Sequence, residues 1–443
     1  MSDSAKLTTG SINGHLVSQT APMLFGAAAI MSIGIVDAYF IGQLGSKELA
    51  AVSFIFPVTI ALSSLGVGVI AGISSVVSRA LGSGDHARAQ QLGNLGMALA
   101  VGFGLIVAGA LYLLKGPLFG VMQADDDLRP LIDAYMTPYA LGFPLLLANM
   151  GGNGVLRGQG AAKRASVILL AFAGANWILD PILIGGIGSF EGFGVAGAAY
   201  ATIAGWAVGT LLAIVFVQTS TIRINPACLT SAQWGAGIWA LVKVGGPAAL
   251  SNAINPIGLS ILTAFLARYG QDEVAGFGAA GRLQSFAVVP LLALSSSIGP
   301  VVGQNWGAGD TGRARKALLH SIAFCLLYGL ITAAILVVAR DWLGGFFSED
   351  PEILDALSRY LLIAAWGFAG YGVLIVVNGA FNAIDQAPVA LGQSAFRVFF
   401  VMVPFAWLAG DALGPNAVYS AELAANIIGG LGAAVLAYYV MRR

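Results

Sequence analysis

LGSGDHARA, residues 81 to 89, recurs in altered form as WGAGDTGRA, residues 306 to 314. The two stretches are 225 residues apart, and the same displacement aligns further residues along the chain. Among the aligned pairs are Pro22 with Pro247, Tyr135 with Tyr360, and Asn153 with Asn378. Similarity that persists at one displacement indicates a duplicated structural unit. We therefore predict two copies of one fold.

The composition is that of a membrane protein. Of the 443 residues, 58% are hydrophobic and 9% are charged, whereas about a quarter of the residues in soluble domains are charged. Apolar runs long enough to cross a hydrocarbon core, which takes about 20 residues, recur throughout. We predict an all-α integral membrane protein with twelve transmembrane helices, at about 16–42, 51–78, 92–113, 131–156, 165–187, 194–218, 238–267, 274–303, 317–338, 355–380, 389–410 and 416–440.

The repeat divides these helices into two lobes. The N-lobe, 1–218, and the C-lobe, 238–443, hold six spans each, and a cytoplasmic loop, 219–237, joins them. Because six is even, both copies enter the membrane in the same orientation and are related by a pseudo-two-fold axis along the membrane normal. Such a pair of bundles suits alternating access, in which a cavity opens first to one side and then to the other.

The distribution of charge predicts the orientation. The segments on the amino-terminal side of the predicted membrane carry twelve basic and four acidic residues, whereas the opposite loops carry five basic residues and a larger number of acids. Basic residues accumulate in cytoplasmic loops, so both termini are predicted to be cytoplasmic. The charge pattern gives no indication of nucleic-acid binding, and we expect a monomer.

Two acids inside predicted spans are confined to the first copy. Asp37 aligns with Leu262, and Asp180 aligns with Phe405. A charged Asp at mid-bilayer costs on the order of 3 kcal/mol or more, so such residues usually face a cavity or a partner. A residue that served only the shared architecture should be present in both copies. Asp37 and Asp180 are therefore predicted to form a cation or proton site.

Local spacing adds polar residues to this site. Asn176 is four residues before Asp180 and shares its helix face. Pro181 frees the carbonyl of Trp177 because it has no amide hydrogen, and Pro22 does the same in the first span, so both prolines are predicted hinges. Two further residues share one face of the fourth span and could complete the lining, Tyr135 and Asn153.

The coupling ion has two candidates. Moving one charge through a membrane potential supplies about 2.3 kcal/mol per 100 mV, and burial together with a neighbouring carboxylate favours protonation of one acid near neutral pH. Coupling to H⁺ is the favoured interpretation. Na⁺ could supply the same work, with Asp37, Asp180 and Asn176 as oxygen ligands.

Several motifs resemble those of the multidrug and toxic compound extrusion (MATE) transporters, over essentially the whole chain. They are VDAYFIGQLGSKELAA (36–51), the paired GSGD and GAGD loops, LRGQG (156–160), NWILDP (176–181) and GVAGAAYAT (194–202). The resemblance implies twelve helices in two lobes and cation-coupled export of amphipathic, often cationic, drug-like compounds. It also implies a secondary active transporter of the bacterial plasma (inner) membrane, neither an enzyme nor dependent on a cofactor.

The chain resembles the DinF-like branch of this family, because it has an Asp in the first span and an Asn and an Asp four residues apart in the fifth. This resemblance implies an N-lobe pocket formed by Asp37, Asn153, Asn176, Asp180 and Thr202, with Tyr135 as a further match. No acid stands at Leu262 or Val401, where other branches have a C-lobe site. The roles of three charged residues within the spans stay open, namely Arg282, Arg397 and Glu422.

Other functions fit the sequence less well. A lipid-linked precursor flippase of the same superfamily would share the topology, but it should have a strongly basic cavity to hold a pyrophosphate. A passive channel would not need two lobes with acids in only one of them. An intramembrane aspartyl protease would use two aspartates as an acid–base pair, but its GxGD-type setting is absent at Asp37 and Asp180. The flippase remains the main alternative.

Overall fold

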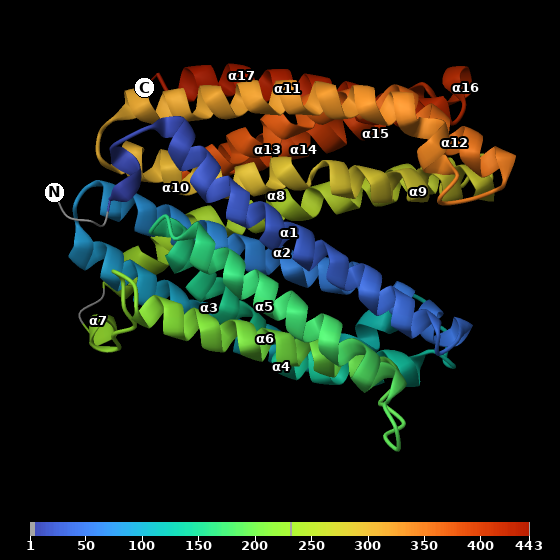
Figure 1. Cartoon of the computed structure of the whole chain (residues 1–443), viewed down its shortest axis with the longest axis horizontal. Coiled ribbons are helices and arrows are strands. Elements are labelled where there is room, and N and C mark those ends of the chain that lie inside the picture. The colour runs from blue at the N-terminus through green and yellow to red at the C-terminus, as the bar shows by residue number, and fades with distance from the viewer. Residues whose placement is uncertain (1–4, 231–232, 443) are drawn as a thin grey trace. The chain divides into compact units, whose positions relative to one another are not determined.

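The computed structural model describes residues 5–230 and 233–442, and these residues are almost entirely helical (Figure 1). Long helices alternate with short connections, and the single isolated β-bridge in the described ranges joins Ile187 to Phe190. The helices of the first half are α1 (Ile12–Gly42), α2 (Ser46–Gly82), α3 (His86–Val121), α4 (Arg129–Gly158), α5 (Ala162–Asp180), α6 (Val195–Gln218) and α7 (Ala227–Thr230), with a 3₁₀ turn η1 (Lys6–Thr8) and a π-helical turn η2 (Pro181–Gly185).

The second half has more interruptions. Its α-helices are α8 (Trp234–Leu266), α9 (Gln271–Ala287), α10 (Val289–Gly307), α11 (Thr311–Gly344), α12 (Pro351–Ala364), α13 (Phe368–Ala383), α14 (Ala387–Ala395), α15 (Val403–Leu408), α16 (Gly410–Leu413) and α17 (Asn416–Val440). A 3₁₀ turn η3 (Ala365–Gly367) separates α12 from α13, and a π-helix η4 (Phe396–Met402) separates α14 from α15.

Eleven spans, some with such an interruption, are long and apolar enough to cross a membrane, and a bent pair of helices makes a twelfth candidate. The fold class predicted from the sequence, an all-helical integral membrane protein, is confirmed. The predicted span 274–303 is not one straight helix, because α9 and α10 meet at Val288 with a bend of 43°. Pro290 lies in the first turn of α10 and cannot donate a backbone hydrogen bond, which explains the break.

The repeated loops are helix caps. Asp85 accepts a hydrogen bond from the Arg88 backbone N–H at 2.9 Å, and Asp310 accepts one from the Arg313 backbone N–H at 2.8 Å. Gly84 and Gly309, which precede these aspartates, both have φ of 78°, a conformation that favours glycine. The GSGD and GAGD motifs therefore start α3 and α11 in the same way.

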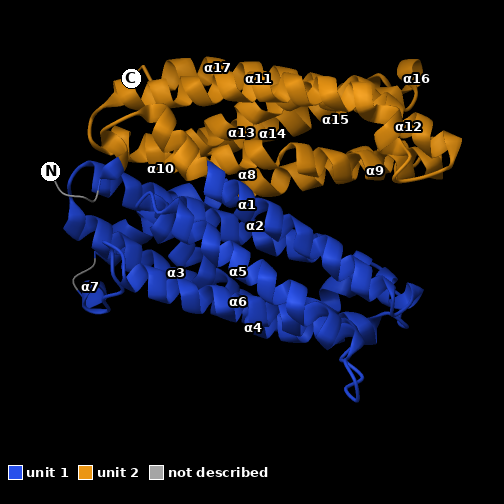
Figure 2. Cartoon of the chain, viewed as in Figure 1, with its two compact units in different colours: residues 1–6, 21–249 blue, residues 7–20, 250–443 orange. Residues whose placement is uncertain are grey.

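Two compact units make up the chain (Figure 2). Unit 1 includes Ala21–Ala249, and unit 2 consists of Leu7–Thr20 and Leu250–Arg443. The change from one unit to the other therefore falls inside α1 and inside α8. Both positions are within three residues of a proline, Pro22 in α1 and Pro247 in α8.

Within unit 1, small residues bring the site helices together. A Cβ on Gly197 would lie 2.0 Å from the Leu183 carbonyl oxygen, so α6 packs directly against the π turn after α5. A Cβ on Gly205 would lie 2.5 Å from the Phe172 ring. Only glycine permits these approaches, which place Thr202 of α6 beside the end of α5.

Candidate functional site

Four helices of unit 1 supply the polar residues of the site. Asp37 is partly exposed near the end of α1, and Tyr135 lies near the start of α4. Asn176 and Asp180 of α5 have no exposed surface, and Thr202 of α6 is 7% exposed. α5 ends at Asp180, and the π turn begins at Pro181, where the sequence predicted a loosened helix.

The Asn176 side chain connects the two acids. Carboxylate oxygens accept hydrogen bonds, so the amide nitrogen faces them. In this orientation it lies 3.3 Å from Asp37 Oδ1 and 2.5 and 3.2 Å from the two Asp180 oxygens. The other end of the same amide lies 3.4 Å from Thr202 Oγ1. One amide thus contacts both carboxyls and the α6 hydroxyl.

The two carboxyls also lie close to each other, since both contact the same amide group. Two carboxyl groups can share a hydrogen bond only when one of them keeps its proton. Within the described residues, no Lys, Arg or His side chain forms a hydrogen bond or ion pair with Asp37 or Asp180. The arrangement can therefore hold and release a proton.

Aromatic residues close one side of the cluster. Tyr135 shares a buried cluster with Ala173 of α5 and Ala199 of α6 and stacks on Tyr139 with ring centroids 5.7 Å apart. Tyr139 in turn meets Trp206 edge-to-face at 5.0 Å. The Trp177 indole, on α5, donates to Ser32 Oγ of α1 at 3.1 Å. Unit 1 thus gathers Asp37, Tyr135, Asn176, Asp180 and Thr202.

Asn153 lies elsewhere in unit 1. Its amide donates to the Ala165 carbonyl at 3.1 Å and accepts from Arg157 Nε at 2.6 Å. Ala165 precedes Asp180 by fifteen residues of α5, which corresponds to about 22 Å along a helix. Tyr135 and Asn153 do lie on one helix, but the eighteen residues between them correspond to about 27 Å of depth. The structure does not bring Asn153 to the two acids.

Unit 2 contains a polar centre that the sequence did not predict. Glu422 of α17, 1% exposed, accepts hydrogen bonds from Gln284 Nε2 at 2.6 Å and from the Tyr360 hydroxyl at 3.1 Å. Arg397, 3% exposed, donates to Asn426 Oδ1 and to Asn255 Oδ1, both at 2.9 Å. The sequence feature that could have indicated this centre is the alignment of Tyr360 with Tyr135 in the repeat.

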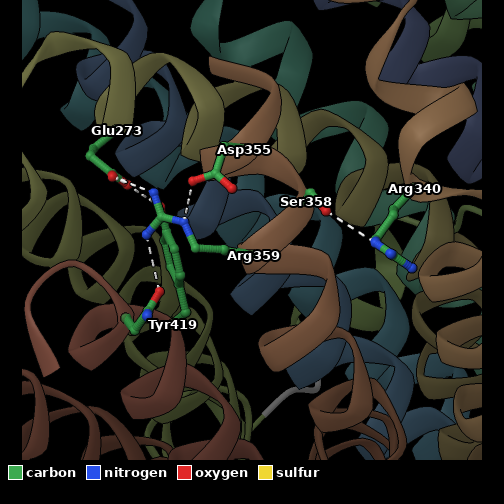
Figure 3. Close-up of polar contacts among 7 residues, drawn as sticks. Glu273, Arg340, Asp355, Ser358, Arg359 and Tyr419 are labelled. Carbon is green, nitrogen blue, oxygen red and sulfur yellow. Dashed lines mark hydrogen bonds and ion pairs between the residues drawn. The ribbon is translucent and has the colours of Figure 1, made fainter. Parts of the chain in front are cut away.

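A separate ion-pair network ties three helices of unit 2 together (Figure 3). Arg359 of α12 lies 2.5 Å from Glu273 of α9 and 2.7 Å from Asp355. The Tyr419 hydroxyl of α17 donates to Glu273 at 2.8 Å. Figure 3 also shows Arg340 donating to Ser358 at 3.0 Å. Since these charges pair with opposite charges or polar partners, we assign the network a structural role.

A protein-family comparison decides the identity of the fold. The MatE family model matches residues 22–182 and 247–408. The chain belongs to the MATE family of transporters. The two matched stretches start 225 residues apart, at Pro22 and Pro247, which is the displacement of the internal repeat. The protein is accordingly a multi-pass membrane transporter and not an enzyme.

Individual MATE proteins are similar over the full length. The chain is 34% identical to the FAD transporter of Shewanella oneidensis, over all of this chain and 97% of that protein. It is 25% identical to the probable multidrug resistance protein YpnP of Bacillus subtilis, over 92% of each. The crystal structure of the Vibrio cholerae MATE transporter VcmN in the bent form matches with a TM-score of 0.91 and 29% identity, over all of this chain and 98% of that one.

Proposed function

We propose that the protein is a proton-coupled antiporter that exports organic compounds by alternating access. The observation that carries the proposal is the contact of both Asp37 and Asp180 with the single amide of Asn176, in a cluster without a basic partner. One proton can be held between the two carboxyls. When it leaves, two adjacent carboxylates repel each other in a buried setting, which disfavours that arrangement of α1 and α5.

Proton coupling is preferred to sodium coupling because two carboxyl groups on one amide, with no basic partner among the described residues, can hold a proton between them. The Asn176 amide can present its nitrogen to a carboxylate or its oxygen to a protonated carboxyl, and Na⁺ would take oxygen ligands only. Asp37, Asp180 and Asn176 remain the residues that would ligate Na⁺ if sodium were the coupling ion. Their arrangement also supports assignment to the DinF-like branch.

Two substrate classes have support. YpnP and the Staphylococcus aureus protein MepA carry names that denote multidrug resistance and multidrug export, at 25% and 24% identity. They support amphipathic, cationic compounds, which the acidic cluster of unit 1 would attract. The Shewanella oneidensis relative is named as an FAD transporter, at 34% identity over 97% of its length. It supports a flavin dinucleotide, which is anionic, as a second candidate.

The coupling proposal is tested in proteoliposomes with a pH gradient and a sodium gradient imposed separately. Asp37→Asn and Asp180→Asn should each remove gradient-driven export, because the site then loses one titratable group. Asp125→Asn, which changes an exposed loop acid, is the matched control and should export like the wild type. Normal export by both span variants under every gradient would sink the proposal, and export driven only by sodium would replace H⁺ by Na⁺.

A further inference from the structure

Arg397 is a cation at mid-span that forms no ion pair or hydrogen bond with any carboxylate of the described residues. Its Nε and Nη1 donate to the amide oxygens of Asn426 and Asn255, and its guanidinium lies 4.9 Å from the Tyr371 ring centroid. The nearby acid, Glu422, bonds instead to Gln284 and Tyr360. An intramembrane arginine is costly and usually functional, and here only neutral groups contact it.

The Asn255 amide is oriented by this arginine. A guanidinium can only donate, so the amide oxygen of Asn255 must face Arg397 and its nitrogen must face away. Asn255 is partly exposed at the surface of unit 2. A Cβ on Gly258, one turn further along α8, would lie 2.4 Å from Met402 of η4, so this part of α8 is held close to Arg397. The Asn255 N–H groups therefore face away from Arg397, on a partly exposed side chain.

Arg282 is an exposed residue that lies as far from the start of α9 as Asn255 lies from the end of α8. It is exposed, and it forms no hydrogen bond, ion pair or aromatic contact with any of the described residues. It follows the start of α9 at Gln271 by eleven residues, and Asn255 precedes the end of α8 at Leu266 by eleven residues. The two helices are consecutive and share one hydrophobic cluster. Both side chains therefore lie about 16 Å from the same helix ends.

The exposed face of α9 is unlike a lipid-facing surface. Its exposed residues at intervals of three and four are Gln271, Ala275, Gly278, Arg282 and Ser285, with the single large apolar residue Phe286 at the end of this face. The corresponding face of α11 exposes Leu327, Ile331, Ile335 and Val338. Acyl chains favour the second kind of face, and water or a polar ligand favours the first.

We propose that Arg282 and the Asn255 amide bind the phosphate groups of an anionic aromatic substrate, and that Arg397 positions Asn255. A guanidinium matches phosphate oxygens in a bidentate geometry. Phe286, one helical turn after Arg282 and 56% exposed, offers an aromatic face for a planar ring. A phosphorylated flavin has both features. The inference rests on the proposed export function and assigns its substrate class.

The test measures binding, which does not depend on a gradient. Purified full-length protein in lipid nanodiscs is titrated with FAD, FMN and uncharged riboflavin, and flavin fluorescence polarisation is recorded. FAD should bind about tenfold tighter than riboflavin, because the phosphates add charge-assisted hydrogen bonds. Arg282→Gln should lose about this tenfold for FAD and leave riboflavin binding unchanged.

Three variants separate the possible explanations. Arg268→Gln removes an exposed arginine two residues after the end of α8 and should bind FAD like the wild type. Asn255→Leu removes the amide N–H groups and should behave like Arg282→Gln. Arg397→Lys keeps the positive charge but loses the planar fork that reaches Asn426 and Asn255 together, so FAD affinity should fall with little change for riboflavin.

The outcomes distinguish this inference from the export proposal. FAD affinity in Arg282→Gln within twofold of the wild type would overturn the phosphate site, as would equally tight binding of riboflavin and FAD by the wild type. Asp37→Asn should retain FAD binding while losing gradient-driven export. If phosphate-dependent binding persists but no gradient drives export in the wild type, the export proposal fails and the binding site stands.

Discussion

Asn176 is the residue on which the unit 1 cluster depends most directly. Its nitrogen contacts both carboxyls, and no other described side chain contacts the two acids and Thr202 together. Asn176→Ala should lower pH-driven export about tenfold, because a hydrogen bond to a charged group contributes about 1.5–3 kcal/mol and about 1.4 kcal/mol is a factor of ten. The measurement is the initial rate of export at a fixed pH gradient.

The matched control for this variant is Asn13→Ala. Asn13 is an exposed amide at the cytoplasm-facing start of α1 in the proposed orientation, and it contacts His320. Its loss should leave the rate unchanged. A rate for Asn176→Ala equal to that of Asn13→Ala would mean that the amide is only packing between helices, and the two acids would then have to act without it.

The sequence indicated several of these residues for physical reasons that the structure makes explicit. Asp37, Asn176 and Asp180 could be placed together because helix spacing and the missing repeat partners pointed to one region. Asn153 could not be placed, since a shared helix face carries no information on depth. The polar centre around Arg397 and Glu422 was hidden because the repeat partners of the two aspartates, Leu262 and Phe405, are apolar.

At the scale of elements, hydropathy predicted the spans but not their interruptions. Apolar runs fix where a helix crosses, whereas the bend at Val288 and the π-helix Phe396–Met402 depend on individual backbone hydrogen bonds. Proline identifies some of these sites, as at Pro181 and Pro290. The π-helix Phe396–Met402 has no proline within it, but Pro404 follows two residues later and leaves the Phe400 carbonyl without its helical donor.

The prolines of α1 and α8 lead to a test of the proposed hinges. Each helix has residues in both units, and the change lies within three residues of Pro22 or Pro247. Any movement of one unit must therefore bend both helices near these points. Pro22→Ala and Pro247→Ala restore a helical amide donor and should each slow export while leaving substrate affinity unchanged, measured by transport rates and by equilibrium binding in parallel.

Pro57→Ala provides the comparison, since Pro57 lies inside α2, which belongs wholly to unit 1. This change should stiffen its helix without slowing export. Equal effects of Pro57→Ala and Pro22→Ala on the export rate would contradict a hinge. Pro181→Ala belongs to the same series, because the π turn that follows Asp180 begins at Pro181.

At the scale of the whole molecule, duplication was the most predictable property. One displacement of 225 residues relates the capping loops, the prolines and the starts of the two family matches. The residues to which we assign the function are those that differ between the two copies. Unit 1 holds two acids within its spans, Asp37 and Asp180, and no described basic side chain pairs with either. Unit 2 holds a buried Arg397 and an exposed Arg282. Because the scaffold is duplicated, one copy can gain charged residues within its spans while the other keeps apolar residues at the same positions.

The orientation of the whole chain is the remaining prediction. The excess of basic residues on the amino-terminal side of the spans predicts that both termini lie in the cytoplasm. Alkaline phosphatase, which is active only outside the bacterial plasma membrane, should therefore be inactive when fused after Arg443 and active when inserted at Ser189, in the exposed hairpin between η2 and α6. A fluorescent protein that folds in the cytoplasm should give the reverse pattern. Phosphatase activity at Arg443 would invert the topology and, with it, the side from which the substrate leaves.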